Sequence, residues 1–423
     1  MKKDSIDINE QAKIKVWVFH PMQQHSYKTA EALLMNNLLD AYWTSVYYQP
    51  NRTIYKILNL ILDKSNIKRM RSRRKECLDS YVRTSSTLLG LLFILSGKID
   101  KSGKLSNYFQ YALSIQTGKK IAKCAIREKV DIIIGYDTWS HGLIKELKKN
   151  SSKIKVVVDY SSLYAEEILQ IINKDIQNNT SIHVSYKKTL AKYAPKYIKA
   201  FCYEKNFADY YLSPSSVVDN SLCNYGADKQ KIFRCTYGGN FERTQVIDKN
   251  YTTVTFIYVG RMSCAKGVHY LLKAFNSIKR KDCKLILVGP DTDNLAKKIT
   301  NPNIKYVGLV NHDEIPKYLL EADVVISASL YDGFSLAILE AAAYNLPIMC
   351  TKNIGAVDYV TKKTGLSFDI QSAEQIENAV AYLLENKQLI RDMSRNVGHI
   401  LDNLTWENYA KEVQNAMCFI NED

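Results

Sequence analysis

The sequence predicts an α/β protein built from two doubly wound parallel sheets, one in each half of the chain, that face a cleft. Two observations lead to this prediction. In both halves, short apolar runs typical of buried parallel strands alternate with longer helical stretches. A chain of 423 residues is also too long for one ordinary hydrophobic core and suggests two domains.

In the first half, the predicted strands are apolar runs with helical stretches between them. These runs cover residues 13–19, 130–134, 155–158 and 200–203. A polar loop over 20–27 joins the first run to a predicted helix over 28–39. Such a loop follows the carboxyl end of a strand, where open parallel sheets bind ligands.

The second half repeats this alternation. Its apolar runs cover residues 254–259, 284–288, 304–307, 324–326 and 347–350. A polar stretch over 243–252 separates the two series, so we place an amino-terminal domain at 1–245 and a carboxy-terminal domain at 246–423. We expect a last helix, over 405–419, to return toward the amino-terminal domain.

Residues 50–115 do not fit the alternation. They contain a basic cluster over 68–75 and an apolar run over 88–95 that is too short to span a bilayer. Residues 1–200 carry 34 Lys and Arg against 17 Asp and Glu, whereas the remainder carries 24 against 26. A basic segment beside apolar side chains can lie on an anionic membrane surface. A solvated insertion is the alternative.

The remaining composition excludes several classes of protein. The nine cysteines are scattered and form no C-x-x-C pair, which favours reduced thiols over a disulfide framework or a zinc site. The first residues lack the apolar core of a secretory signal. No nucleic-acid recognition motif accompanies the positive charge. We therefore expect a cytoplasmic protein, peripheral at the inner face of the cell membrane, that does not bind nucleic acid.

Two carboxylates, Asp332 and Glu340, lie on a predicted strand-to-helix turn. The apolar run over 322–327 precedes them, and good helix formers fill residues 335–344. Free backbone N–H groups and the helix dipole make such a turn an anion site. The eight positions from one carboxylate to the other span about 12 Å of helix, comparable to a nucleotide-sugar lying along it.

A second turn places two cations directly after a strand. Gly260, Arg261 and Lys266 follow the run over 254–259, and a helix over 269–278 comes next. Both cations could reach a diphosphate at such a turn. The alternatives that involve no ligand are a solvated loop for the cations and helix capping for the carboxylates.

The two turns together resemble the retaining glycosyltransferases of family 4, which have the GT-B fold of two Rossmann-like domains. The resemblance is closest over residues 205–370, where it includes the segments 208–215 and 237–240. The first 200 residues match only in their rhythm of strands and helices. Several separate matches in the expected order make the resemblance specific.

The resemblance implies that Arg261 and Lys266 hold the donor diphosphate and stabilise it as the leaving group. Fixed cations and helix N-termini can meet this charge without a metal. No Asp-x-Asp motif in a plausible site suggests a metal-bridged diphosphate, so we expect no metal and no cofactor besides the UDP- or GDP-sugar substrate.

The resemblance also implies roles for the other turn. Asp332 would bind hydroxyls of the donor sugar, with the N–H groups of Gly333, Phe334 and Ser335 nearby, and Glu340 would bind the ribose. The family usually has glutamate at the first acidic position. The shorter aspartate keeps the charge but changes its reach by one methylene.

The first half offers candidates rather than a motif. His25 lies in the loop after the first strand, and His20 lies one step closer to that strand. Asp137 and Trp139 follow the run over 130–134, and Asp159 follows the run over 155–158. Many family members have a histidine near this last position, which this chain lacks. We favour His25 and Asp159 as catalytic residues of the cleft.

These observations predict a retaining, metal-independent hexosyltransferase that moves a sugar from a nucleotide donor to a saccharide or lipid-linked saccharide. In the family, retention is generally explained by front-face attack, which needs no carboxylate nucleophile. An epimerase acting on the nucleotide-sugar itself is one alternative. A catalytically inactive subunit that binds a sugar-nucleotide or a glycan is another.

Overall fold

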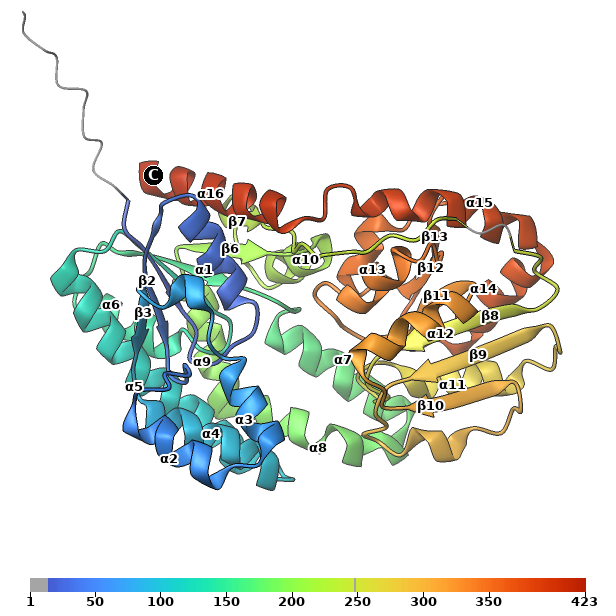
Figure 1. Cartoon of the computed structure of the whole chain (residues 1–423), viewed down its shortest axis with the longest axis horizontal. Coiled ribbons are helices and arrows are strands. Elements are labelled where there is room, and N and C mark those ends of the chain that lie inside the picture. Colours follow the sequence, from blue (N-terminus) through green and yellow to red (C-terminus); the bar gives the residue numbers. More distant parts are fainter. Residues whose placement is uncertain (1–13, 247–248) are drawn as a thin grey trace, which may run out of the picture.

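A computed structural model describes residues 14–246 and 249–423. Figure 1 shows two α/β halves side by side along the long axis of the molecule. Within the described residues, the amino-terminal half contains a seven-stranded parallel sheet in the order β3-β2-β1-β4-β5-β6-β7. Its strands are β1 (Val16–Phe19), β2 (Leu39–Thr44), β3 (Val82–Thr84), β4 (Ile132–Tyr136), β5 (Lys155–Asp159), β6 (Tyr210–Ser213) and β7 (Ile232–Arg234).

The carboxy-terminal half contains a six-stranded parallel sheet in the order β10-β9-β8-β11-β12-β13, again counted over the described residues. Its strands are β8 (Val254–Val259), β9 (Cys283–Val288), β10 (Ile304–Gly308), β11 (Val324–Ser327), β12 (Ile348–Thr351) and β13 (Gly365–Phe368). Each sheet reverses its strand order beside its first strand, as doubly wound sheets do. The predicted fold class of two such sheets is confirmed.

Helices cover both faces of each sheet, which is why the strands are apolar on both sides. The amino-terminal half contains α1 (Ser26–Met35), α2 (Thr53–Ile61), α3 (Lys64–Arg71), α4 (Thr87–Ile99), α5 (Lys104–Glu128), α6 (His141–Lys149), α7 (Ala165–Asn178), α8 (His183–Lys192), α9 (Pro195–Phe207) and α10 (Ser216–Asn224). The carboxy-terminal half contains α11 (Val268–Ser277), α12 (Ile315–Glu321), α13 (Leu336–Ala342), α14 (Ala373–Glu385), α15 (Lys387–Val397) and α16 (Trp406–Glu422).

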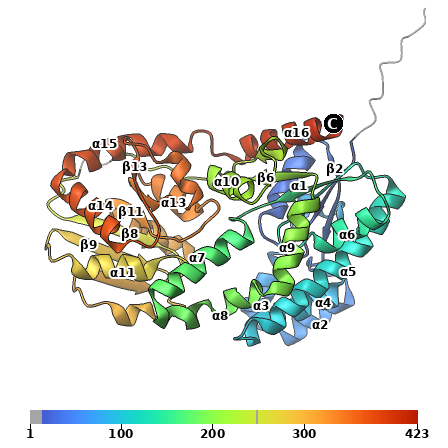
Figure 2. The same cartoon turned by 180° about the vertical axis from the view of Figure 1, so that it is seen from behind.

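The last helix crosses back to the first half. Figures 1 and 2 both show α16 over the amino-terminal sheet, beside α1. The hydroxyls of Thr29 and Tyr409 lie 2.8 Å apart, and the Asn36 amide donates to the Ala410 carbonyl at 3.2 Å. The buried core of the amino-terminal half is therefore continuous with the end of the chain.

One strand predicted for the first half is wrong, and one predicted helix is shorter at its carboxyl end than expected. Residues 200–203 belong to α9, and Ala200 and Phe201 lie on the buried side of this helix. The next strand in the chain is β6. The helix predicted over 28–39 ends at Met35, since Asn37 adopts a positive φ of 56° and the chain then enters β2. The apolar run over 88–95 forms the middle of α4.

Candidate active site

The topology brings the two predicted turns of the carboxy-terminal half together. Strands β8 and β11 are neighbours at the point where the strand order reverses, so the turns after them share one edge of the sheet. Lys266 follows β8, Asp332 follows β11, and the Lys266 Nζ lies 2.5 Å from the Asp332 Oδ2. The two turns therefore face a common space.

Glycine allows the turns to approach this closely. Gly267 has a φ of +65°, and a Cβ built on it would lie 1.7 Å from the Ala328 carbonyl oxygen. Any side chain at this position would push the Lys266 turn away from the Asp332 turn. The ion pair between the turns depends on this contact.

The Asp332 carboxylate is held in its charged form. Burial opposes ionisation, but the Lys266 ammonium and the hydrogen bonds from Ser335 and Phe334 outweigh it and lower the Asp332 pKa. The N–H groups of Phe334 and Ser335 donate to Asp332 Oδ1 at 3.4 and 3.3 Å. The N–H groups expected near the donor are thus occupied by Asp332 in this structure.

Gly333 places the two halves of the chain in contact. A Cβ on Gly333 would lie 2.0 Å from the Ser161 carbonyl oxygen, in the loop after β5. The carbonyl of Gly333 is in turn 2.2 Å from where a Cβ of Gly355 would lie. Gly333, whose N–H group was expected near the donor sugar, thus permits a close approach between the backbones of the two halves.

The predicted donor residues line two cavities along α13. The first, of about 310 Å³, is lined by Lys266, Asp332, Phe334 and Ser335 together with Ser161 and Tyr237. The second, also of about 310 Å³, contains Glu340 with Asn240, Phe241, His312 and Tyr344. Arg261 is exposed and is not among the residues that line either cavity.

The balance of effects on the Glu340 carboxyl group is the reverse of that on Asp332. Burial raises the Glu340 pKa, and the nearby His312 opposes this effect only in part. The carboxyl group therefore retains its proton more readily than an exposed glutamate does. A bound hydroxyl could accept or donate a hydrogen bond there.

In the amino-terminal half, the two favoured residues meet. The His25 Nε2 lies 2.8 Å from the Asp159 Oδ2, although 134 positions separate them. The Tyr237 hydroxyl lies 3.0 Å from the same histidine nitrogen and donates to Asp159 Oδ1 at 3.3 Å. The Tyr237 ring contacts Phe334 at a centroid distance of 5.3 Å, which joins this cluster to the Asp332 turn.

Two other candidates are core residues. His20 is 1% exposed, its Nδ1 accepts the Met22 N–H, and burial lowers its pKa to about 3. Trp139 is 5% exposed and packs against His20 and Phe93. Neither side chain is placed to contact a substrate.

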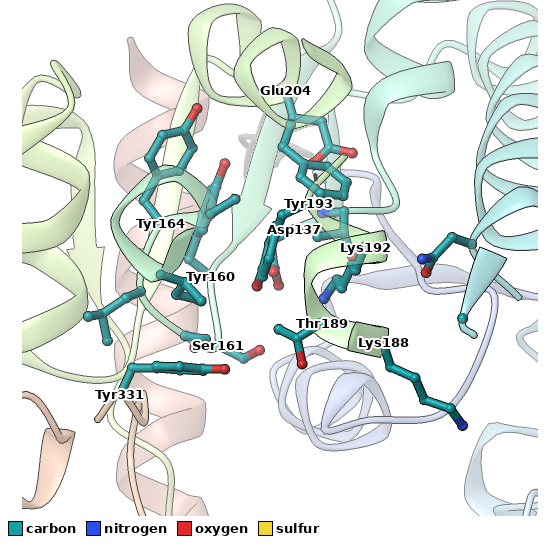
Figure 3. Close-up of a pocket in the computed structure, with 18 of the residues that line it drawn as sticks. Asp137, Tyr160, Ser161, Tyr164, Lys188, Thr189, Lys192, Tyr193, Glu204 and Tyr331 are labelled. Carbon is teal, nitrogen blue, oxygen red and sulfur yellow. Dashed lines mark hydrogen bonds between the residues drawn. The ribbon is translucent and has the colours of Figure 1, made fainter. Parts of the chain in front are cut away.

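Asp137, by contrast, lines the largest of the cavities described here. This cavity has a volume of about 410 Å³ and lies between the amino-terminal sheet and α8. Figure 3 shows Asp137 near its centre, between Tyr160 on one side and Thr189 and Lys192 on the other. Burial raises the Asp137 pKa, and its buried Oδ1 has no hydrogen-bond partner.

A buried glutamate positions the Asp137 loop. Glu204 of α9 accepts the N–H groups of Thr138 at 2.7 Å and His141 at 2.8 Å. Burial raises the Glu204 pKa to about 8, although these two N–H groups oppose the rise. Thr138 has a φ of +69°, a conformation that a threonine rarely adopts.

No local pattern in the sequence predicted most of this cavity. Tyr164, Tyr193, Glu204 and Tyr331 come from four separate elements, and no local pattern connects them. Tyr237 did carry a signal, because it lies in the segment 237–240 that resembled the family. It was not predicted to contact His25 and Asp159.

Comparison with known proteins identifies the carboxy-terminal half. Residues 241–399 match the family described as Glycosyl transferases group 1. Over this stretch the carboxy-terminal half is similar to group 1 glycosyltransferases. The match covers the turns of Lys266 and Asp332 and the whole of α13.

Curated relatives are similar over longer stretches. An uncharacterized 41.2 kDa protein in the cps region of Klebsiella pneumoniae is 22% identical over 291 residues, which cover 65% of this chain and 77% of that protein. A probable sucrose-phosphate synthase of Thermosipho melanesiensis is 24% identical over 252 residues, which cover 56% of this chain and 57% of that protein. The family match and such names support a glycosyltransferase, as the sequence predicted.

Solved structures confirm the GT-B fold. HepE of Anabaena, determined in complex with UDP, superposes with a TM-score of 0.59 at 14% identity, covering 96% of this chain and all of that chain. At this identity the similarity concerns the fold alone. Within residues 14–246 and 249–423, none of the helices combines the length and the apolar character needed to cross a membrane.

Proposed function

We propose that the chain is a retaining, metal-independent glycosyltransferase of family 4 that uses a nucleotide-sugar donor. The Lys266–Asp332 pair is the observation that carries the proposal. It lies at the point where the strand order of the carboxy-terminal sheet reverses, beside a cavity that also touches the amino-terminal half through Ser161 and Tyr237. A donor bound there would have its reacting bond between the two sheets.

Lys266 would stabilise the leaving diphosphate. Breaking the bond between the sugar and the diphosphate builds negative charge on the phosphate oxygens, and a fixed ammonium group lowers the energy of that charge. In this structure the ammonium pairs with Asp332. Arrival of the diphosphate would let Lys266 bind phosphate, while Asp332 would accept hydrogen bonds from sugar hydroxyls. Arg261 would reach the diphosphate from the exposed turn.

The donor would lie along α13. Glu340 lies near the carboxyl end of α13, whereas Asp332 precedes the amino end of this helix. Glu340 and its cavity would receive the ribose. HepE was crystallised with UDP and with UDP-glucose, which supports a UDP-sugar; a GDP-sugar is the other candidate. His25 and Asp159 would border the sugar from the amino-terminal side.

The acceptor would occupy the cavity of Figure 3. Ser161 lines both this cavity and the donor cavity, so the two spaces meet at one residue. Tyrosine rings and carboxyl groups, such as Tyr160 and Asp137, suit the faces and hydroxyls of a saccharide. The acceptor is a saccharide or a lipid-linked saccharide. The charge of the first 200 residues would place the enzyme at an anionic membrane surface.

A donor-binding experiment tests this function. The protein is heated with UDP-, GDP- and ADP-sugars, with and without EDTA, and the midpoint of unfolding is recorded. We expect one nucleotide class to raise the midpoint equally under both conditions, because binding to the folded state stabilises it. Lys266→Ala should lose the shift, whereas Lys284→Ala, at an exposed position of β9, should keep it.

Product analysis then separates the candidate activities. Transfer to an added saccharide with retained anomeric configuration supports the proposal. Release of free nucleotide without a glycosylated product would indicate an epimerase, and donor binding without any turnover would indicate a binding subunit. An unchanged thermal shift in Lys266→Ala would remove the proposed diphosphate site.

A further inference from the structure

Helix α4 exposes an apolar stripe to solvent. Leu88, Leu92, Leu95 and Ile99 recur at helical spacing and are 67, 38, 52 and 64% exposed. Residues on the other side of α4, among them Phe93, pack against the core. A helix that is apolar on all sides is normally buried on all sides or faces lipid. The exposed stripe of α4 is therefore not covered by the parts of the chain that the structure describes.

Two neighbouring helices extend this apolar surface. Helix α2 exposes Ile57, Leu60 and Ile61 on one face, with Leu60 87% exposed. The first turn of α5 exposes Leu105 and Tyr108. Figures 1 and 2 show α2, α3 and α4 together at the end of the amino-terminal half that lies opposite α16.

Basic side chains surround the apolar ones. Helix α3 lies between α2 and α4 in the chain and is linked to α4 by a 2.6 Å hydrogen bond from Lys98 to Asn66. Its exposed residues include Lys64, Lys68, Arg69 and Arg71. Residues 52–104 contain thirteen Lys and Arg against four Asp and Glu. Apolar side chains within a strongly positive surface are complementary to an anionic bilayer, since the acyl region and the headgroups each find a partner.

The surface reaches the rim of the proposed acceptor cavity. Ser106 and Asn107, in the first turn of α5, line that cavity, whereas Leu105 and Tyr108 of the same turn face outward. The apolar surface and the cavity wall thus lie on two sides of the same helical turn. A bilayer that covered Leu105 and Tyr108 would bring its headgroups to the cavity rim.

We propose that α2, α4 and the first turn of α5 form a face that docks on an anionic lipid bilayer and sets the cavity rim at the headgroup level. The acceptor is then a saccharide presented on a membrane lipid, a step that rests on the proposed function. The apolar side chains enter the acyl boundary, and α3 binds the anionic headgroups. Docking needs no bilayer-spanning helix.

Vesicle co-sedimentation tests the docking face. The full chain is mixed with phosphatidylcholine vesicles that contain or lack phosphatidylglycerol. We expect binding to anionic vesicles that weakens with salt, and little binding to neutral ones. The triple variant Leu60→Ser, Leu92→Ser, Leu95→Ser should bind at least about tenfold more weakly, because it loses three exposed apolar side chains that would enter the bilayer. Lys68→Gln with Arg69→Gln and Arg71→Gln should lose about tenfold and most of the salt dependence.

Leu309→Ser is the matched control, because Leu309 is 77% exposed in the carboxy-terminal half, and it should bind as the wild type does. Brominated lipids test the orientation. The tryptophan added by Tyr108→Trp should be quenched, whereas that of Tyr306→Trp should not. Each variant is compared with wild type for circular dichroism and for the thermal shift with the donor, so misfolding is detected.

Three results would overturn the proposal. Wild-type protein could fail to bind anionic vesicles, or the leucine variant could bind them as tightly as wild type does. The wild type could also be a dimer in vesicle-free solution that the leucine variant dissociates, which would make the surface a protein interface. Vesicle binding without any donor-induced thermal shift would refute the proposed function and leave the docking face intact.

Discussion

The carboxyl edges of the two sheets share a strand order but differ in chemistry. The edge of the carboxy-terminal sheet joins Lys266 and Asp332. These residues have opposite charges and lie on turns that local sequence patterns predicted. The edge of the amino-terminal sheet joins His25, Asp159 and Tyr237, and the contacts of His25 with the other two cross more than a hundred positions. One topology thus carries an ion pair at one edge and a cluster of imidazole, carboxyl and phenol groups at the other. The difference suits a diphosphate at one edge and a saccharide at the other.

The largest effect is expected from the carboxy-terminal edge. Asp332→Ala should lower kcat by about 100- to 1000-fold, because it removes the group proposed to orient the sugar and leaves Lys266 without its partner. Asp332→Glu, which restores the residue usual in the resembling family, should retain activity within about tenfold. Initial rates at saturating donor measure both. An Asp332→Ala enzyme within threefold of wild type would contradict the role of this edge.

Asp159→Asn should have a smaller effect and a different kinetic signature. It keeps the shape of a side chain that is 1% exposed but removes the charge beside His25. We expect kcat to fall about 10- to 100-fold while the donor-induced thermal shift stays unchanged. Asp369→Asn, at an exposed surface pair, serves as the control. Loss of donor binding in Asp159→Asn would contradict the assignment of donor binding to the carboxy-terminal sheet alone.

The backbone contact between the edges can be tested by adding a methyl group. Gly333→Ala should lower the free energy of unfolding by about 1–3 kcal/mol, since the new Cβ would overlap the Ser161 carbonyl. Gly97→Ala adds the same methyl group on α4, where no atom lies within 4 Å, and should not destabilise the protein. Chemical denaturation compares the two variants. Equal stability would mean that the loops separate without cost.

The smallest effect concerns Glu204 and pH. Its pKa of about 8 lies above the ordinary 4.5, so the folded state binds this proton more tightly than the unfolded state does. The resulting stability is complete below about pH 4.5 and is lost as the pH rises through 8. Glu204→Gln cannot titrate, so its free energy of unfolding, measured by chemical denaturation, should fall less than that of wild type between pH 5 and 8.5, by about 1 kcal/mol or more.

The control for this pH series is Glu76→Gln, because the Glu76 side chain is 85% exposed. It should follow the wild-type curve over the same range. A Glu204→Gln curve parallel to wild type would place the titrating group elsewhere. The comparison also tests whether the loop of Asp137 is held by a protonated carboxyl group.

Short-range patterns were sufficient for much of the carboxy-terminal half. The strand predicted over 254–259 is β8 without any shift, and the helix expected behind Gly333 begins at Leu336. Each depends on periodicity and on residues within one or two turns of each other. The same reasoning failed at residues 200–203, where four apolar residues in a row fitted either a strand or one side of a helix. Packing against neighbouring elements decided that they are helical.

The sequence by itself determined the fold class, the two marked turns and the excess of positive charge in the first half, because each is a property of composition or of local spacing. Only the tertiary structure decided that Lys266 pairs with Asp332, that His25 meets Asp159, and that Gly333 abuts the opposite half. It also decided which apolar side chains of α4 remain uncovered. Such contacts depend on which strands lie side by side and which helix faces meet, and this is set by the packing of the whole chain.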